Sequence, residues 1–325
     1  MRILLTHTPT MRANYYGDEA LASLRGVGEV RLVEYETPLT PQKLIDLATD
    51  ADVIIADRLT TGPAEVFANL PGLKAFLRCA VDIRNIDVAA ASRVGVLVTR
   101  AKPGFVESVT ELTLGFLVDL ARGISRATAS YHANELPQIK MGRQLAGSTI
   151  GIIGYGSIGR NLANVAAVLG MAVLVTDPHV TIDDPRFRQV ELDALLESAD
   201  HVVCLAVAVE ATENLIDTRA LRLMKRDAVF INVSRGNLVD EQALADALCD
   251  GRIAGAAMDV GRAVDQMPTP TLAALPNVVA TPHIGGLTPP AIAAQALDTV
   301  EQVRELARGG VPHGAVNASD WRRRL

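Results

Sequence analysis

The chain has 325 residues, of which 49% are hydrophobic, and its 31 lysines and arginines against 37 aspartates and glutamates leave a formal net charge of −6. This length exceeds what one ordinary hydrophobic core supports, so we expect two domains. The acidic balance excludes nucleic acid as a favoured partner. The longest apolar runs have the length of a strand, well short of the roughly 20 residues that cross a bilayer, so no membrane partner is expected.

The cysteines and the N-terminal residues indicate in which cellular compartment the protein is expected. The three cysteines are widely spaced and indicate neither a disulfide framework nor a zinc site, and we expect no bound metal. Only three apolar residues follow Arg2 before polar ones intervene, far fewer than the apolar core of a signal peptide. We therefore expect a cytoplasmic protein.

Short β-branched runs alternate with amphipathic stretches of helical length along the first hundred residues. This alternation is typical of a parallel sheet covered by helices on both faces. Strands are predicted at residues 2–6, 30–35, 53–56, 73–77 and 96–99. Helices are predicted between them at residues 17–24, 41–48, 64–68 and 87–93.

Pro103 and Gly104 interrupt this pattern ahead of one long predicted helix, residues 106–129. Six further strands, with helices between them, suit a dinucleotide-binding sheet. They are predicted at residues 149–153, 172–176, 201–205, 229–233, 255–258 and 278–280. A final helix is predicted near 290–308. We expect an α/β protein with two Rossmann-like, doubly wound parallel-sheet domains, in which residues 102–286 are inserted into a discontinuous domain of residues 1–101 and 287–325.

A glycine-rich turn directly follows the strand predicted at 149–153 and opens a helix predicted at 160–169. Gly154 permits the tight turn, Gly156 lets the backbone approach a pyrophosphate, and Gly159 allows close packing of helix on strand. The N–H groups of Ser157 and Ile158 begin the helix, where anions bind favourably. A purely structural turn, or a fold that binds another ligand such as S-adenosylmethionine, is the alternative.

Asp177 ends the second strand of this series, eighteen positions after Gly159. An acidic side chain here accepts hydrogen bonds from a ribose diol and repels the 2′-phosphate of NADP, so NAD is the expected cofactor. Because Pro178 and His179 follow, a role for Asp177 in capping or in a turn is the alternative.

Three stretches resemble the D-isomer-specific 2-hydroxyacid dehydrogenase family in content, order and spacing. They are Leu-Ala-Gly at 145–147, Asn-Val-Ser-Arg-Gly at 232–236 and Thr-Pro-His-Ile-Gly-Gly at 281–286. The resemblance implies hydride transfer between NAD(H) and a small D-2-hydroxy acid or its 2-keto acid. It also implies that residues 102–286 form the cofactor domain, that the other domain binds substrate, and that the protein is a homodimer.

Arg235 and His283 match the two catalytic positions of the family. By resemblance, Arg235 binds the substrate carboxylate, and a guanidinium suits this role because its planar fork of donors matches a carboxylate. His283 matches the acid/base histidine, and an imidazole exchanges protons near neutral pH. The alternative for Arg235 is a salt bridge at the end of a strand. Val233 and Asp259 are also expected to contact the cofactor.

The sequence departs from the family at the acidic partner of the histidine. The family has a glutamate five residues after the aspartate matched by Asp259, and here that position is Val264. A carboxylate beside an imidazole favours its protonated form, so its loss should weaken His283 as an acid. Asp265 is the expected replacement if the loop shifts by one residue. A solvent-exposed Asp265 is nearly as well supported.

The substrate loop also differs. The main-chain N–H groups of Ala80 and Val81 match those that bind the substrate carboxylate in the family, although Ala80 replaces a glycine and Arg84 an aspartate. Arg84 is either solvated or adds charge for a dianionic substrate, and Arg58 is a similar candidate. Two alternatives therefore remain: a reductase of a bulkier or phosphorylated 2-keto acid, and a non-enzymatic nucleotide sensor on the same scaffold.

Overall fold

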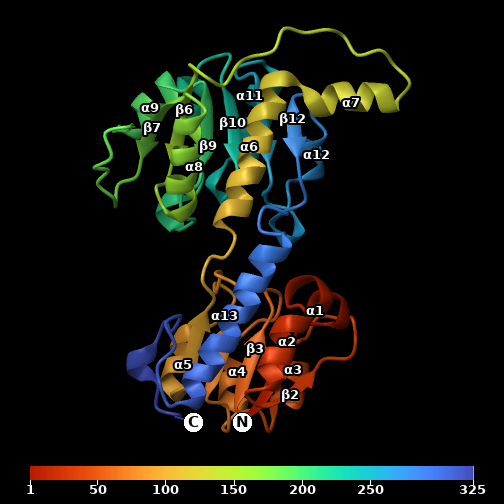
Figure 1. The fold of residues 1–325 in the computed structure, drawn as a ribbon, viewed down its shortest axis with the longest axis vertical. Coiled ribbons are helices and arrows are strands. Elements are labelled where there is room, and N and C mark those ends of the chain that lie inside the picture. The colour runs from red at the N-terminus through yellow and green to blue at the C-terminus, as the bar shows by residue number, and fades with distance from the viewer. Residues whose placement is uncertain (325) are drawn as a thin grey trace. The chain divides into compact units, whose positions relative to one another are not determined.

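The computed structural model describes residues 1–324, which divide into two compact units. Unit 1 consists of Met1–Phe105 and the chain from Leu287 onward, and unit 2 consists of Val106–Gly286. Unit 1 is therefore discontinuous in sequence, as the colours in Figure 1 show: red and orange segments lie beside blue ones.

The sheet of unit 1 has five strands, all parallel, in the order β2-β1-β3-β4-β5. This is the flavodoxin-like order of doubly wound sheets. All five predicted strands are present, and their ends differ from the predicted ones by no more than three residues. They are β1 (Arg2–Leu5), β2 (Glu29–Leu32), β3 (Val53–Ala56), β4 (Ala75–Arg78) and β5 (Leu97–Arg100).

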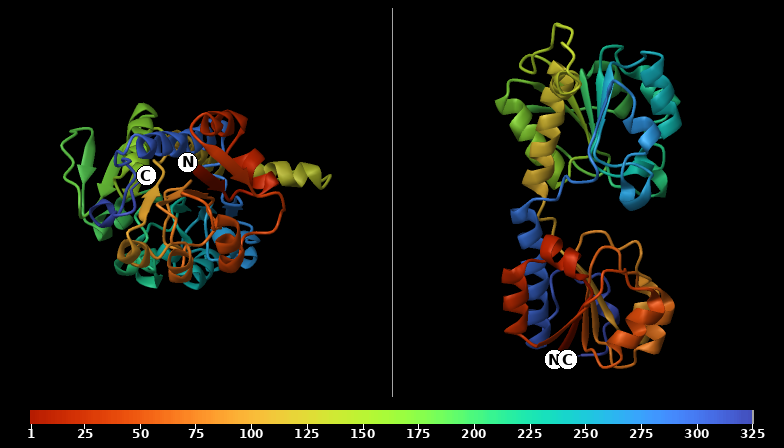
Figure 2. Two further views of the ribbon diagram at one scale, coloured as in Figure 1. Left: turned by 90° about the horizontal axis from the view of Figure 1, so that it is seen from below. Right: turned by 90° about the vertical axis from the view of Figure 1, so that its right-hand side faces the viewer.

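Helices cover both faces of this sheet (Figure 2). One face packs against α3, α4 and α5, and the other against α2 and the C-terminal helix α13, which brings the last part of the chain into unit 1. Local capping fixes where helices begin: the side chain of Asp87, for example, accepts a hydrogen bond of 2.8 Å from the N–H of Ala90. The helices are α1 (Pro9–Tyr15), α2 (Asp18–Arg25), α3 (Pro41–Ala48), α4 (Ala64–Asn69), α5 (Val88–Val94) and α13 (Pro289–Ala307).

The sheet of unit 2 has seven parallel strands in the order β12-β11-β10-β9-β6-β7-β8. The chain reverses its winding direction between β6 and β9, and ligands of such sheets bind at the carboxyl ends beside that point. The six predicted strands are present, and β8, with a single buried residue, was missed. The strands are β6 (Thr149–Ile153), β7 (Ala172–Thr176), β8 (Phe187–Gln189), β9 (His201–Cys204), β10 (Val229–Asn232), β11 (Gly255–Met258) and β12 (Val278–Ala280).

Helices also cover both faces of the unit 2 sheet (Figure 2). None of the helices in residues 1–324 combines the length and apolar character needed to span a membrane. The helices are α6 (Val106–Arg122), α7 (Ile124–His132), α8 (Ser157–Val168), α9 (Leu192–Ser198), α10 (Thr218–Leu223), α11 (Glu241–Cys249) and α12 (Pro270–Ala273), with short 3₁₀ turns η1 (Glu210–Thr212), η2 (Gly236–Leu238) and η3 (Val264–Gln266).

The prediction of one helix over 106–129 is wrong. Gly123 adopts a left-handed conformation (φ 67°) that ends α6, and α7 starts in a new direction (Figure 1). Asp119 stabilises the break because its side chain accepts a hydrogen bond of 2.8 Å from the N–H of Ser125. Gly123 stands alone between Arg122 and Ile124, and one isolated glycine does not by itself predict the end of a helix.

Candidate active site

The glycine-rich turn joins β6 to α8 at the carboxyl edge of the unit 2 sheet. Gly154 has φ 99°, and a Cβ there would lie 2.7 Å from the main chain of Leu205. A Cβ on Gly159 would lie 2.2 Å from the carbonyl oxygen of Gly154. The predicted tight turn and close packing are therefore confirmed. Gly156, by contrast, faces open space and is exposed, as is Ser157.

The end of β7 is tied to this turn by Asp177. Its carboxylate accepts hydrogen bonds from the main-chain N–H groups of Tyr155, at 2.7 Å, and His179, at 2.9 Å. The turn role considered for Asp177 is thus present. A carboxylate has about four lone-pair positions, so the same group can still accept from a ribose diol. The open space at Gly156 and this half-buried acid beside it fit a dinucleotide.

Arg235 lies in the turn between β10 and η2. The buried Asn232 shapes this turn: its amide nitrogen donates to the carbonyl of Arg235 at 2.9 Å, and its amide oxygen accepts from the N–H of Ser234 at 3.1 Å. The guanidinium of Arg235 is half-buried and donates to the carbonyl of Ser234 at 2.7 Å. Val233 is buried in the same segment.

Asp259 follows β11 and holds the loop that carries His283. Its buried carboxylate accepts from the hydroxyl of Thr281 at 2.6 Å and from the N–H groups of Ile284 and Gly285 at 2.8 Å each. Its carbonyl accepts from the N–H of His283 at 3.0 Å. The structure thus assigns Asp259 a role in shaping the loop, whereas its contact with a cofactor stays a prediction.

His283 itself has a left-handed backbone (φ 56°), a conformation that a residue with a side chain adopts only when its surroundings hold it there. Its ring nitrogen Nδ1 lies 2.8 Å from the main-chain carbonyl oxygen of Asp265. The predicted neighbourhood of His283 and Asp265 is therefore present, and the contact is made through the backbone. Val264 points into solvent, with 84% of its surface exposed.

Sheet topology places these groups at one edge. Arg235 follows β10, Asp259 follows β11 and His283 follows β12, and these three parallel strands are neighbours. The glycine turn follows β6, which is separated from β10 only by β9. A guanidinium, an imidazole and a dinucleotide-type turn thus share the carboxyl edge of one sheet.

In unit 1, Ala80 and Val81 lie in the loop after β4. The buried Arg78 anchors this loop, because its guanidinium donates to the carbonyl groups of Asp57 and Thr60 and to the side chain of Asn85. Arg84, one of the two additional arginines considered for a dianion, is paired with Asp82 at 2.7 Å.

Arg58, the other of these arginines, is half-buried in the loop after β3, and its guanidinium carbon lies 5.0 Å from the centre of the Tyr15 ring. No group of three His, Cys, Asp or Glu side chains suited to a metal ion occurs among the described residues.

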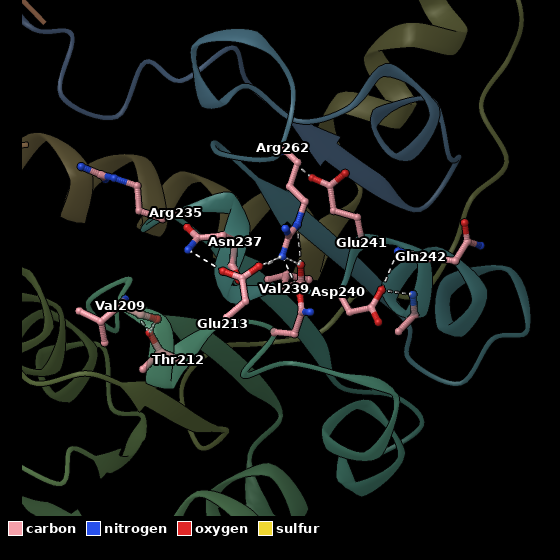
Figure 3. Close-up of polar contacts among 12 residues, drawn as sticks. Val209, Thr212, Glu213, Arg235, Asn237, Val239, Asp240, Glu241, Gln242 and Arg262 are labelled. Carbon is pink, nitrogen blue, oxygen red and sulfur yellow. Dashed lines mark hydrogen bonds and ion pairs between the residues drawn. The ribbon is translucent and has the colours of Figure 1, made fainter. Parts of the chain in front are cut away.

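Sequence reasoning missed Arg262. Its guanidinium donates to Glu213 at 2.9 Å, Asn214 at 2.6 Å and the carbonyl of Val239 at 3.1 Å, and so joins the loops after β9, β10 and β11 (Figure 3). An arginine in a polar loop gives no sequence signal for such a role, since its partners are 23 to 49 positions away.

A doubly wound domain with this turn and this edge defines a dinucleotide-binding dehydrogenase scaffold. Residues 114–285 match the family model described as D-isomer specific 2-hydroxyacid dehydrogenase, NAD binding domain. The chain belongs to this family, and residues 114–285 form its NAD-binding domain.

Relatives agree with this assignment. A D-3-phosphoglycerate dehydrogenase of Methanocaldococcus jannaschii is 34% identical over 305 residues, which cover 92% of this chain and 57% of the relative. An (S)-sulfolactate dehydrogenase of Chromohalobacter salexigens is 36% identical over 279 residues, covering 84% and 90%. A D-lactate dehydrogenase with NAD+ from Lactobacillus jensenii has a similar fold, with a TM-score of 0.82, 25% identity and coverage of 97% and 99%. This chain thus spans little more than half of the first relative.

Proposed function

We propose that this protein catalyses reversible hydride transfer between NAD(H) and C2 of a small D-2-hydroxy acid or its 2-keto acid. The observation that carries this proposal is the placement of Arg235 and His283 after the strands that flank β11, at the edge where the glycine turn lies. Family membership and the dehydrogenase names of the relatives support it.

In this proposal Arg235 binds the substrate carboxylate and polarises the adjacent carbonyl. Its guanidinium remains charged at every working pH and provides several donors in one plane. His283 gives a proton to the carbonyl oxygen when the keto acid is reduced and removes it in the reverse direction. Asp265 and Asp259 support His283 through the contacts described above.

The cofactor would be held by the N–H groups of Gly156, Ser157 and Ile158 against its phosphates and by Asp177 against its ribose. Once bound, NAD(H) supplies or accepts the hydride. The acidic Asp177 favours NAD over NADP because a 2′-phosphate would meet its negative charge. Val233, buried just after β10, is proposed to pack against the cofactor.

For unit 1 we propose substrate binding through the N–H groups of Ala80 and Val81. The anchoring of their loop by the buried Arg78 supports this role, since a binding loop must hold its donors in place. In this proposal the binding partner of unit 1 is a small-molecule substrate.

A substrate with a second anionic group is favoured by a specific observation. Phosphoglycerate and sulfolactate, named in two of the relatives, each carry one. Arg58, in the loop after β3, and Arg84, in the loop after β4, are the two arginines of unit 1 that we propose for such a group.

We also propose a cytoplasmic homodimer. Apolar side chains with no place in the core gather on α7 and the segment after it: Tyr131 is 61% exposed, Leu136 91%, Ile139 99% and Met141 99%. An exposed apolar surface of this kind is typical of a contact with another protein molecule.

The test is to mix the purified protein with NADH and a panel of 2-keto acids, some with and some without a phosphate or sulfonate on C3. We expect NADH oxidation, and we expect Arg235→Ala to reduce kcat/KM by about 1,000-fold, equivalent to about 4 kcal/mol, while the Kd for NADH stays within about twofold. Arg219→Ala, which removes an exposed arginine paired with Asp193, is the matched control and should be silent.

Tight NADH binding without oxidation by any member of the panel would replace this proposal with the nucleotide sensor. Loss of NADH binding in Arg235→Ala would instead show that Arg235 supports the fold.

A further inference from the structure

The hydrogen bond at Nδ1 of His283 determines which ring nitrogen can exchange a proton with a substrate. The partner is the main-chain carbonyl of Asp265, at 2.8 Å, and a carbonyl oxygen can only accept. The neutral ring must therefore carry its proton on Nδ1, which leaves Nε2 as the atom that takes up and releases a proton. The orientation of His283 thus depends on where the loop places one carbonyl group.

That carbonyl belongs to a strained segment. Asp265 (φ 56°, ψ 27°) and Gln266 (φ 58°) both have left-handed backbones. Such conformations are unfavourable for residues with a side chain, so other contacts must hold the segment in place. Part of the hold is internal, since the N–H of Gly261 donates to the carbonyl of Gln266 at 2.7 Å and that of Ala263 to Met267 at 3.0 Å.

The rest of the hold comes from Arg262 and Glu241. Arg262 bridges from this loop to Glu213 and Val239, as Figure 3 shows, and to Asn214. One carboxylate oxygen of Glu241 accepts from the N–H of Arg262, and the other accepts from the hydroxyl of Thr269, both at 2.8 Å. Glu241 therefore fastens the loop at two points on opposite sides of Asp265.

Glycine contacts bring this loop against the segment that carries Arg235. A Cβ on Gly236 would lie 2.1 Å from the main chain of Gly261, and a Cβ on Gly261 would lie 2.5 Å from Cα of Pro268. The loop therefore packs, backbone on backbone, on the residue next to Arg235. Its position is fixed relative to both proposed catalytic side chains.

We propose that Arg262 and Glu241 are positioning residues, which hold the 261–268 loop so that the carbonyl of Asp265 fixes His283 in its Nδ1–H form. At position 264 the family has a glutamate that contacts the histidine, and here Val264 points into solvent. We propose that the carbonyl of Asp265 orients the ring instead. The proposal rests on the proposed function for the role of His283, but the tautomer can be measured without any activity.

The experiment uses the full-length chain with ¹⁵N-labelled histidine, and His283→Gln identifies the signals of His283. In the unchanged protein we expect the neutral ring to be protonated on Nδ1. In Arg262→Met we expect a mixture of tautomers and a kcat about 10- to 100-fold lower, since a small misplacement of a catalytic group has effects of this size, with the Kd for NADH unchanged. Arg262→Lys, which retains the charge and one donor group, should recover part of the loss.

Arg219→Met is the matched control, because Arg219 forms an exposed pair with Asp193 outside this loop. If Arg262→Met does not fold, Thr269→Val removes one anchor of Glu241 and should shift the tautomer in the same direction. An Nε2–H signal in the unchanged protein, or identical His283 signals in every folded loop variant, would overturn the proposal. If no keto acid is reduced but the tautomer shifts as expected, the proposed function fails and the positioning role stands.

Discussion

The polar side chains at the carboxyl edges of the two sheets differ in their exposure to solvent. In unit 1, His7 and Asp57 lie just after β1 and β3 and Arg78 ends β4, and these three residues are 1%, 3% and 0% exposed. In unit 2 the turns after the strands carry Gly156, which is exposed, and Arg235 and His283, which are half-buried. These polar side chains of unit 1 are thus enclosed, whereas Arg235 and His283 are partly accessible.

The difference reflects what buried polar groups require. A buried charge is tolerated when hydrogen bonds surround it, and Asp57 accepts four, from Thr6, Leu59 and twice from Thr60. Such a network determines the shape of the unit 1 loops, whereas the half-buried groups of unit 2 are accessible to a ligand. We therefore expect changes at the buried residues of the unit 1 edge to act on stability, and changes at the exposed or half-buried residues of the unit 2 edge to act on ligand binding.

The largest loss of stability is expected from a change at Arg78. Arg78→Met leaves the carbonyl groups of Asp57 and Thr60 without their donor, and we expect unit 1 to lose about 3 kcal/mol of stability. Trp321, the only tryptophan, is buried in unit 1, so its fluorescence during urea unfolding reports on this unit.

The matched control for Arg78→Met is Arg84→Met, which removes an exposed pair and should cost less than about 1 kcal/mol. Equal losses in the two variants would contradict the structural role of the buried edge. NADH binding, which belongs to unit 2, should be the same in both.

A smaller loss of stability is expected when the pH is lowered. Burial lowers the pKa of His7 from 6.5 to about 4, so the folded chain holds a neutral imidazole. Below pH 6.5 the unfolded chain binds a proton that the folded chain does not bind until about pH 4, and stability therefore falls as the pH falls. Between pH 7 and 4.5 the unchanged protein should lose roughly 2 kcal/mol more than His7→Gln does. A parallel pH dependence of Trp321 unfolding in the two proteins would contradict this.

The smallest effect on stability is expected in the glycine-rich turn of unit 2. Gly156→Ala places a methyl group in open space at a negative φ, so the stability should stay within about 0.5 kcal/mol of its original value. The Kd for NADH should rise about tenfold if the pyrophosphate passes this residue, as titration of NADH fluorescence would show.

Gly159→Ala provides the contrast, since its methyl group would clash with the carbonyl of Gly154 and cost about 1 to 3 kcal/mol of stability. Unchanged NADH affinity in Gly156→Ala would place the cofactor phosphates elsewhere.

The fold class and most of the unit 2 edge could be predicted from the sequence. Strands and helices are local patterns, so their order was readable without coordinates. The glycine turn, Asp177, Arg235 and His283 each begin within three residues of the end of a predicted strand. The break at Gly123 and the short strand β8 were missed because an isolated glycine and a strand with one buried residue are weak local signals.

How these groups are held depends on the tertiary structure. The partners of Arg262 and Glu241 lie 21 to 49 positions away, and the buried hydrogen bonds among Thr6, Asp57 and Arg78 join β1, β3 and β4. That the carbonyl of Asp265 reaches His283 depends on backbone angles that no residue type dictates. Hydrogen bonds between distant segments form from the packing of whole elements, and for that reason the sequence pattern does not record them.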